Sequence, residues 1–122
     1  MTTSEIAQRL ATLVREGKSE QAVAELYSPD IVSIEPEGSP NPIVKGLDGI
    51  KKKWKEFDAL IEEVHSTYIS DPQVADDFFS LTMKLDVTMT GYGRIPMNEV
   101  CVYGVTDGKI VLEQFFYKTE PQ

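Results

Sequence analysis

Apolar residues at helical spacing open the chain. Ile6, Leu10 and Leu13 fall on one face of a helix, because side chains three and four residues apart lie above one another. Thr2 followed three residues later by Glu5 has the pattern of a capping box, in which two side chains satisfy the free amides of a first turn. We therefore expect a helix that begins after Thr2.

Two further helices are expected before residue 63. Ser19 is placed to cap a short one, which must end at Ser28-Pro29 because the residue before a proline avoids the α conformation. The clearest helical pattern follows Gly46, where apolar residues recur at intervals of four, three and four: Ile50, Trp54, Phe57 and Ile61.

The pattern changes to strands after residue 63. Between residues 79 and 90 apolar and polar side chains alternate, which is typical of a strand with one buried face. Other strands are expected at residues 31–34, 64–70, 95–106 and 109–118. Helices first and a strand meander afterwards predict one α+β domain over residues 1–122, with a mostly antiparallel sheet.

The net charge of the chain limits the classes of partner that it can bind. Its formal net charge is −8, and its one basic run, Lys51 to Lys53 with Lys55, is expected on the solvated side of the third helix. Nucleic acid and anionic membranes bind basic surfaces, so we expect neither as a partner.

Cys101 is the one cysteine, so no intrachain disulfide can form. The first ten residues lack the apolar core of a signal peptide, and a cytoplasmic location is expected.

Short segments in a particular order resemble a known superfamily. They are AELYSPDIV at 24–32 leading to Glu35-Pro36, Gly46 before the third helix, and DGKIV at 107–111. With the order of elements, they make the chain similar to the NTF2-like superfamily, in its SnoaL-like and ketosteroid-isomerase-like branches. This resemblance implies a curved sheet wrapped against three helices, a cystatin-like roll with a cone-shaped pocket.

The resemblance leaves the function open. The superfamily includes isomerases, dehydratases, cyclases, hydrolases and non-enzymatic modules, and a shared fold does not settle which of these a chain is. It implies a pocket for a small apolar or polyketide-like ligand and, for an enzyme, acid–base chemistry without an external cofactor. The alternative is a non-catalytic, dimeric binding or interaction module.

Glu35 lies where ketosteroid isomerases carry their proton-shuttling carboxylate. It is therefore a candidate base, while the alternative is an exposed glutamate of a loop. The oxyanion hole of those isomerases needs a tyrosine on the first helix and a protonated aspartate on a late strand. The resemblance places Leu10 or Ala11 and Cys101 at these positions. Neither can donate a strong hydrogen bond to an enolate, so steroid isomerisation is not expected.

The turn at Asp107-Gly108 decides which carboxylates face the pocket. A two-residue loop pairs Thr106 with Lys109 and sends Glu113 to the other face of the sheet from Glu99, since a one-residue slip reverses every side chain. We predict a three-residue loop instead, which agrees with the pocket positions that the resemblance implies. The pocket then holds Glu99 and Glu113, with the ligand-binding candidates Trp54, Phe57, Cys101, Tyr103, Phe115 and Tyr117.

Two consequences follow from this register. Glu99 and Glu113 would influence each other, so at least one should titrate well above its ordinary value. The opposite face would carry an apolar patch, which indicates a homodimer, because patches of this kind usually mark protein contacts. Its members are Val100, Val102, Leu112 and Phe116.

His65 is the one histidine of the chain. It is a candidate acid–base partner of a pocket carboxylate, since its ordinary pKa is close to neutrality, and the alternative is a histidine at the rim. His65 with Glu99 and Glu113 would suit an open zinc geometry. No short ligand spacing such as HxxxH or CxxC supports a metal, and none is expected.

Overall fold

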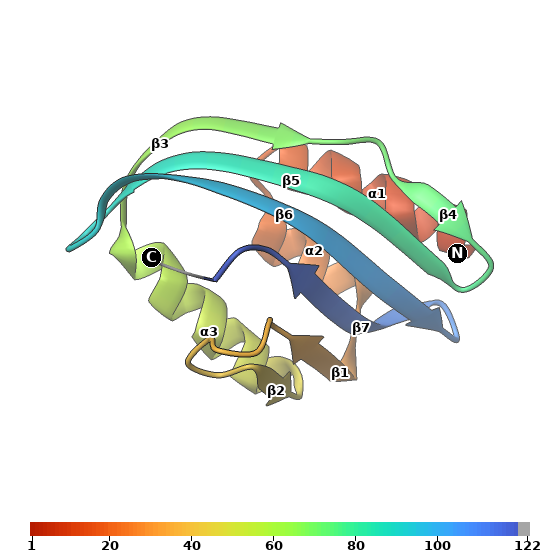
Figure 1. Cartoon of the computed structure of the whole chain (residues 1–122). Coiled ribbons are helices and arrows are strands. Elements are labelled where there is room, and N and C mark those ends of the chain that lie inside the picture. Colours follow the sequence, from red (N-terminus) through yellow and green to blue (C-terminus); the bar gives the residue numbers. More distant parts are fainter. Residues whose placement is uncertain (120–122) are drawn as a thin grey trace.

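Three helices lie against one face of a curved sheet in the computed structural model of the chain, which describes residues 1–119 (Figure 1). The helices are α1 (Thr3–Arg15), α2 (Ser19–Leu26) and α3 (Leu47–Leu60). The strands are β1 (Tyr27–Ile34), β2 (Ile43–Lys45), β3 (Ile61–Ile69), β4 (Gln73–Ala75), β5 (Phe78–Met89), β6 (Gly93–Thr106) and β7 (Lys109–Phe116). The predicted α+β class is confirmed.

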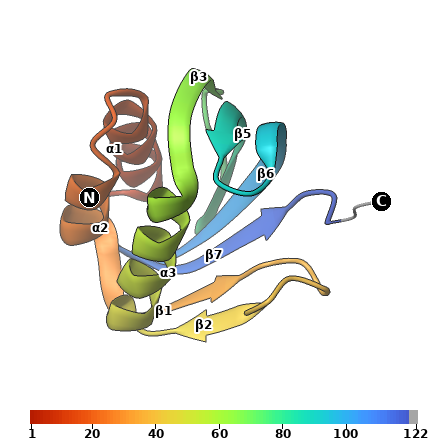
Figure 2. The ribbon, with the colours of Figure 1, turned by 90° about the vertical axis from the view of Figure 1, so that its left-hand side faces the viewer.

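The sheet is mixed but mostly antiparallel, as predicted. Its order is β2-β1-β7-β6-β5-β3, with β4 also paired to β5, and the β1–β7 pair is the parallel one. Figure 2 shows the strands in an arc that curls around α3, with α1 and α2 on the same side. We call the face toward the helices the inner face and the opposite one the outer face. Strands β2 and β4 were not predicted, because three residues are too few to show a period.

The start of α1 agrees with the capping box. The Glu5 amide donates to the Thr2 hydroxyl at 3.1 Å, and the Thr2 amide donates to the Glu5 carboxylate at 2.7 Å. The expected cap of the second helix is wrong, because Ser19 is the first residue of α2 and the capping position is Lys18, which makes no side-chain cap. The apolar face of α1 is buried against the sheet, together with the apolar side chains of α2.

Strand β5 carries the alternation that the sequence predicted. Phe79, Leu81, Val87 and Met89 are buried, whereas the polar residues between them lie on the outer face. The inner face is therefore mainly apolar, and any polar side chain that points into it must find a partner or change its protonation.

The predicted three-residue turn between β6 and β7 is wrong. Thr106 pairs with Lys109, so the turn has two residues, and Asp107 (φ 50°) and Gly108 (φ 74°) both adopt the left-handed conformation of a type I′ turn. The twist of this turn matches that of the strands, which favours it over a longer loop.

A β-bulge in β7 then restores the inward face that the longer turn would have produced. Ile110 pairs with Val105 but Leu112 pairs with Gly104, so Val111 is an extra residue. Beyond it, Tyr103 lies opposite Glu113 and Cys101 opposite Phe115. Glu113 therefore points to the inner face although the turn has two residues.

No helix within residues 1–119 is long and apolar enough to cross a membrane. The cytoplasmic location stays a prediction from the sequence.

Candidate functional site

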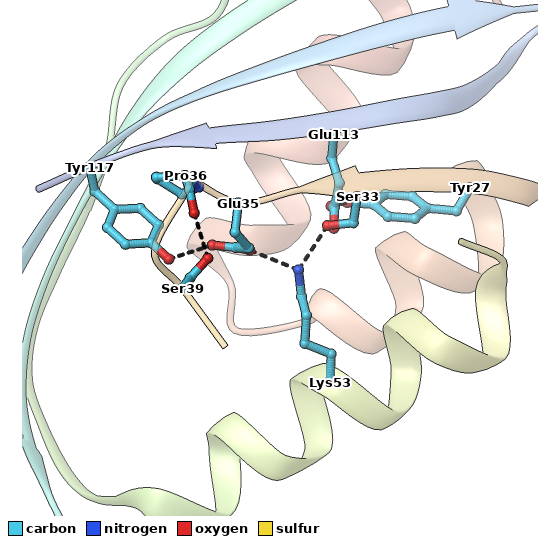
Figure 3. A network of polar contacts seen from close by, with 8 residues as sticks. All are labelled: Tyr27, Ser33, Glu35, Pro36, Ser39, Lys53, Glu113 and Tyr117. Carbon is cyan, nitrogen blue, oxygen red and sulfur yellow. Dashed lines mark hydrogen bonds and ion pairs between the residues drawn. The ribbon is translucent and has the colours of Figure 1, made fainter. Parts of the chain in front are cut away.

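A chain of polar contacts crosses the inner face between α3 and the strands β1 and β7 (Figure 3). Lys53 of α3 lies at its centre. Its ammonium group forms an ion pair with Glu35 at 2.7 Å and donates a hydrogen bond to the Ser33 hydroxyl at 2.8 Å. The group of connected side chains, which we call the polar network, consists of Tyr27, Ser33, Glu35, Lys53, Glu113 and Tyr117.

Glu113 occupies the deep end of the polar network. It is 0% exposed, and its two carboxylate oxygens accept hydrogen bonds from Tyr27 at 2.5 Å and Ser33 at 2.7 Å. Burial raises the pKa of Glu113, and the hydrogen bonds from Tyr27 and Ser33 with the charge of Lys53 oppose that rise. These contacts stabilise the ionised form of Glu113, which burial disfavours.

Glu35 occupies the other end, directly after β1. The Tyr117 hydroxyl donates to one of its oxygens at 2.6 Å, and Lys53 donates to the other. Burial raises the pKa of Tyr117, as does its hydrogen bond to Glu35, so its phenol stays a neutral donor. The Ser39 hydroxyl donates to the Pro36 carbonyl at 2.6 Å and closes the turn that follows Glu35.

Glu99 differs from the other two inner carboxyl groups. It lies on β6 opposite Met83 of β5, which places it on the inner face. Within residues 1–119 its carboxyl group makes no hydrogen bond or ion pair. Burial and the charge of Glu35 raise the pKa of Glu99, the charge of Lys53 opposes them, and the result is a pKa of about 7. Near neutral pH this carboxyl group is therefore present in both protonation states.

Apolar and aromatic side chains surround these groups. Cys101, Tyr103 and Phe115 are buried on the inner face, and the Lys53 ammonium lies 5.4 Å from the centre of the Phe115 ring. Burial raises the pKa of Cys101 to about 12, so its thiol is neutral and unreactive. Trp54 meets the buried ring of Tyr27 edge to face, with 5.8 Å between the ring centres.

The structure brings most of the predicted site residues together. Glu35, Glu99, Glu113 and Tyr117 meet at the inner face, with Trp54 and Phe57 half-buried on the facing helix. Two surface hollows lie elsewhere, one along α1 and one between Met1 and the β6–β7 turn, and no residue of the polar network lines either of them. A ligand pocket at the polar network therefore stays a prediction.

His65 lies apart from the other candidates. Its ring bonds the Thr88 hydroxyl at 2.7 Å, and Thr88 is on the outer face of β5, whereas Glu99 and Glu113 are on the inner face. The second ring nitrogen of His65 is 3.5 Å from Glu63. The sheet thus separates His65 from the carboxyl groups that it was expected to serve, and these three residues cannot share a metal ion.

Lys53 is the functional residue that the sequence analysis placed wrongly. The basic run was expected to lie in solvent, and Lys51, Lys52 and Lys55 do so, but the side chain of Lys53 is only 20% exposed. The signal was present, because Lys53 follows the buried Ile50 by three residues and shares its face of the helix. Ser33 and Tyr27 were also missed, since nothing near them in the sequence indicates a buried carboxylate partner.

Residues 1–117 match the model of one protein family, the SnoaL-like domain. This chain belongs to the SnoaL-like domain family. No curated protein matches it.

Solved structures agree with this membership. A protein from Mesorhizobium loti, described as a SnoaL-like polyketide cyclase and carbohydrate phosphatase, is 34% identical, with a TM-score of 0.91, and the match covers 96% of this chain and 100% of the other. An NTF2-like protein from Burkholderia pseudomallei is 16% identical, with a TM-score of 0.79 over 98% and 93% of the two chains. A protein with a ketosteroid-isomerase-like fold from Catenulispora acidiphila is 19% identical, with a TM-score of 0.73 over 94% and 86%. The last two similarities concern the fold alone.

Proposed function

We propose that this SnoaL-like protein binds a small, largely apolar carbonyl compound at its inner face and moves a proton next to the carbonyl group. The observation that carries the proposal is Glu99, an inner-face carboxyl group without a bonding partner among residues 1–119 and with a pKa raised to about 7. A group of this kind both accepts and donates protons near neutral pH, as a general acid–base catalyst must.

The neighbouring side chains suit the charge that such a step creates. When the Glu99 carboxylate removes a proton from the carbon beside a carbonyl, the electron pair moves to the carbonyl oxygen, which becomes an enolate. The Lys53 ammonium lies on the same face, and its positive charge would stabilise this negative charge, whereas the one hydroxyl hydrogen of Tyr117 is already donated to Glu35. Isomerisation, dehydration and cyclisation can all begin with this step, and the 34% identical relative is described as a cyclase.

Glu35 has a supporting role in this proposal. Both of its oxygens are engaged, one by Lys53 and the other by Tyr117. The bond from Lys53 is charge-assisted and the bond from Tyr117 is neutral, and both stabilise the ionised carboxylate. A carboxylate that is stabilised in this way is a poor base. Glu99 has no such bonds to break, so we assign the proton transfer to Glu99 rather than to Glu35.

The ion pair of Glu35 also favours a second candidate, a binding module without catalysis. Lys53 and Glu35 satisfy each other at 2.7 Å, and a neutralised pair of this kind is typical of a structural rather than a reactive carboxylate. In this case the inner face would hold a ligand and transfer no proton.

Proton exchange separates the two candidates. We expect the protein to speed the exchange of the α-protons of a small aromatic ketone such as 2-tetralone with heavy water, followed by proton NMR. The rate should rise with pH and level off above about pH 7, because the ionised form of Glu99 is the base. Binding of the ketone, detected by line broadening, without faster exchange would instead support the binding module.

The outer face supports the proposal of a homodimer. Val100 of β6 and Phe116 of β7 lie opposite each other and are 46% and 49% exposed. Val102 and Leu112 are half-buried on the same face beside them. A second copy of the chain can cover this patch with the same surface, as a two-fold axis requires.

Replacing Phe116 by aspartate should convert a dimer into a monomer, because a charge in the middle of an apolar contact is costly to bury. Sedimentation at micromolar protein concentration checks this, with Tyr92→Asp as the control, since Tyr92 is 71% exposed at the β5–β6 turn, away from the patch. A wild-type protein that sediments as a monomer would rule out this dimer.

A further inference from the structure

One ammonium group serves two carboxylates at the inner face. Lys53 contacts Glu35 directly at 2.7 Å, and it reaches the buried Glu113 through Ser33, whose hydroxyl lies 2.8 Å from Lys53 and 2.7 Å from Glu113. We propose that Lys53 is the positioning residue of the site, a role that rests on the proposed function: it keeps Glu35 and Glu113 as fixed carboxylates, so that Glu99 is the group left to exchange a proton.

Chemistry sets the direction of each bond in the polar network. An ammonium group can only donate, so Ser33 accepts from Lys53 and its own hydrogen is directed to Glu113. The Tyr27 hydroxyl donates to the second oxygen of Glu113. The donors of the polar network are therefore all directed toward Glu35 or Glu113. Loss of Lys53 would remove the bond to Glu35 and the bond that orients the Ser33 hydroxyl toward Glu113.

The charges at the inner face explain why Glu99 is the group that differs. The carboxyl groups of Glu35, Glu99 and Glu113 face the ammonium group of Lys53. In apolar surroundings one positive charge does not readily offset three negative ones, so the three groups do not easily ionise at the same time. Glu35 and Glu113 each receive two hydrogen bonds. The proton is therefore best held by Glu99.

Lys53 is held firmly enough to act in this way. Its side chain is 20% exposed, its stem lies on the inward face of α3, and its ammonium lies over the Phe115 ring. The same charge also acts on Glu99, whose pKa it lowers against the opposing effects of burial, Glu35 and Glu113. The neutral thiol of Cys101 and the neutral phenols of Tyr103 and Tyr117 are further titratable groups around Glu99.

Four variants test the proposal: Lys53→Met, Lys53→Arg, Ser33→Ala and, as the matched control, Lys52→Met. Lys52 is the exposed neighbour of Lys53, and its side chain makes no hydrogen bond or ion pair within residues 1–119. The readout is the titration of Glu99 and Glu113, followed by NMR of the carbon-13-labelled side-chain carboxyl groups, with each signal assigned by its loss in a glutamine variant.

We expect Lys53→Met to raise the titration midpoints of both Glu99 and Glu113 by about one pH unit or more, because the positive charge of Lys53 lowers the pKa of both carboxyl groups. Ser33→Ala should raise the midpoint of Glu113 and leave that of Glu99 in place, since it removes one hydrogen bond and keeps the ammonium group. Lys53→Arg should stay close to the wild type, and Lys52→Met should not differ from it.

Unchanged midpoints in Lys53→Met would overturn the positioning role, whether or not the protein exchanges ketone protons. If Lys53→Met does not fold, a Ser33→Ala protein with an unchanged Glu113 midpoint would overturn it equally. Conversely, shifted midpoints in a protein that shows no α-proton exchange would support the role of Lys53 and reject the proposed function.

Discussion

Replacing Glu99 by glutamine should lower the rate of α-proton exchange by about 100-fold or more at about pH 8, because a positioned general base contributes about that much. Glutamine has nearly the shape of glutamate and no basic oxygen of comparable strength. The Glu99 side chain makes no hydrogen bond or ion pair within residues 1–119, so the substitution breaks no bond of this kind and the fold should be retained.

The control for this variant is Glu37→Gln. Glu37 is an exposed residue of the loop after β1, close in sequence to Glu35 but outside the polar network. It should exchange protons at the wild-type rate. An E99Q protein that is folded and still exchanges protons as fast as the wild type would show that Glu99 is not the base.

The second large effect concerns stability. Replacing Tyr27 by phenylalanine should lower the free energy of unfolding by about 2 kcal/mol at about pH 8, because the lost bond stabilises the ionised form of a buried carboxyl group. The phenyl ring keeps the apolar contacts of Tyr27, including the edge-to-face contact with Trp54. The loss should therefore come from Glu113 alone.

The loss of stability in Y27F should depend on pH, because the lost hydrogen bond acts on the pKa of Glu113. The hydrogen bond from Tyr27 lowers the pKa of Glu113, so its removal raises that pKa further above the ordinary value of 4.5. A raised pKa in the folded protein means stability that is present at low pH and lost as the pH rises through the folded pKa. The difference between wild type and Y27F should thus be smaller at about pH 4 than at about pH 8.

Denaturant unfolding at the two pH values measures this difference. Tyr92→Phe is the matched control, since Tyr92 is 71% exposed and its hydroxyl makes no hydrogen bond within residues 1–119. A loss of stability in Y27F that is the same at both pH values would show that Glu113 is not ionised in the folded protein.

The sequence was sufficient where its signals are local and periodic. The face of α1, the Thr2–Glu5 cap and the alternation of β5 all depend on residues within a few positions of one another. Short elements such as β2 and β4 have no period to detect. The fold could therefore be predicted, and these two short strands could not.

In the β6–β7 hairpin the predicted turn length was wrong, but the predicted inward position of Glu113 was right. The type I′ turn alone would have sent Glu113 outward, and the bulge at Val111 turned it inward again. No feature of the sequence near Val111 marks a bulge. The inward position of Glu113 was predicted because the resemblance implied it, not because the turn was understood.

The polar network could not be predicted because its members are far apart in the sequence. Tyr27 and Glu113 are separated by 86 positions, and Tyr117 and Glu35 by 82. Such contacts arise from the parallel pairing of β1 with β7, which the sequence pattern does not reveal. Lys53 is the exception, since its helical spacing from Ile50 indicates an inward position that the sequence analysis overlooked.

The most direct test of the account is the titration of Glu99 in the wild-type protein, by NMR of carbon-13-labelled glutamate side chains. The E99Q variant identifies the signal. We expect a midpoint of about 7, because burial and the charge of Glu35 oppose ionisation. A midpoint close to the ordinary value of 4.5 would mean that Glu99 is ionised and well solvated near neutral pH, and it would contradict the acid–base role assigned to it.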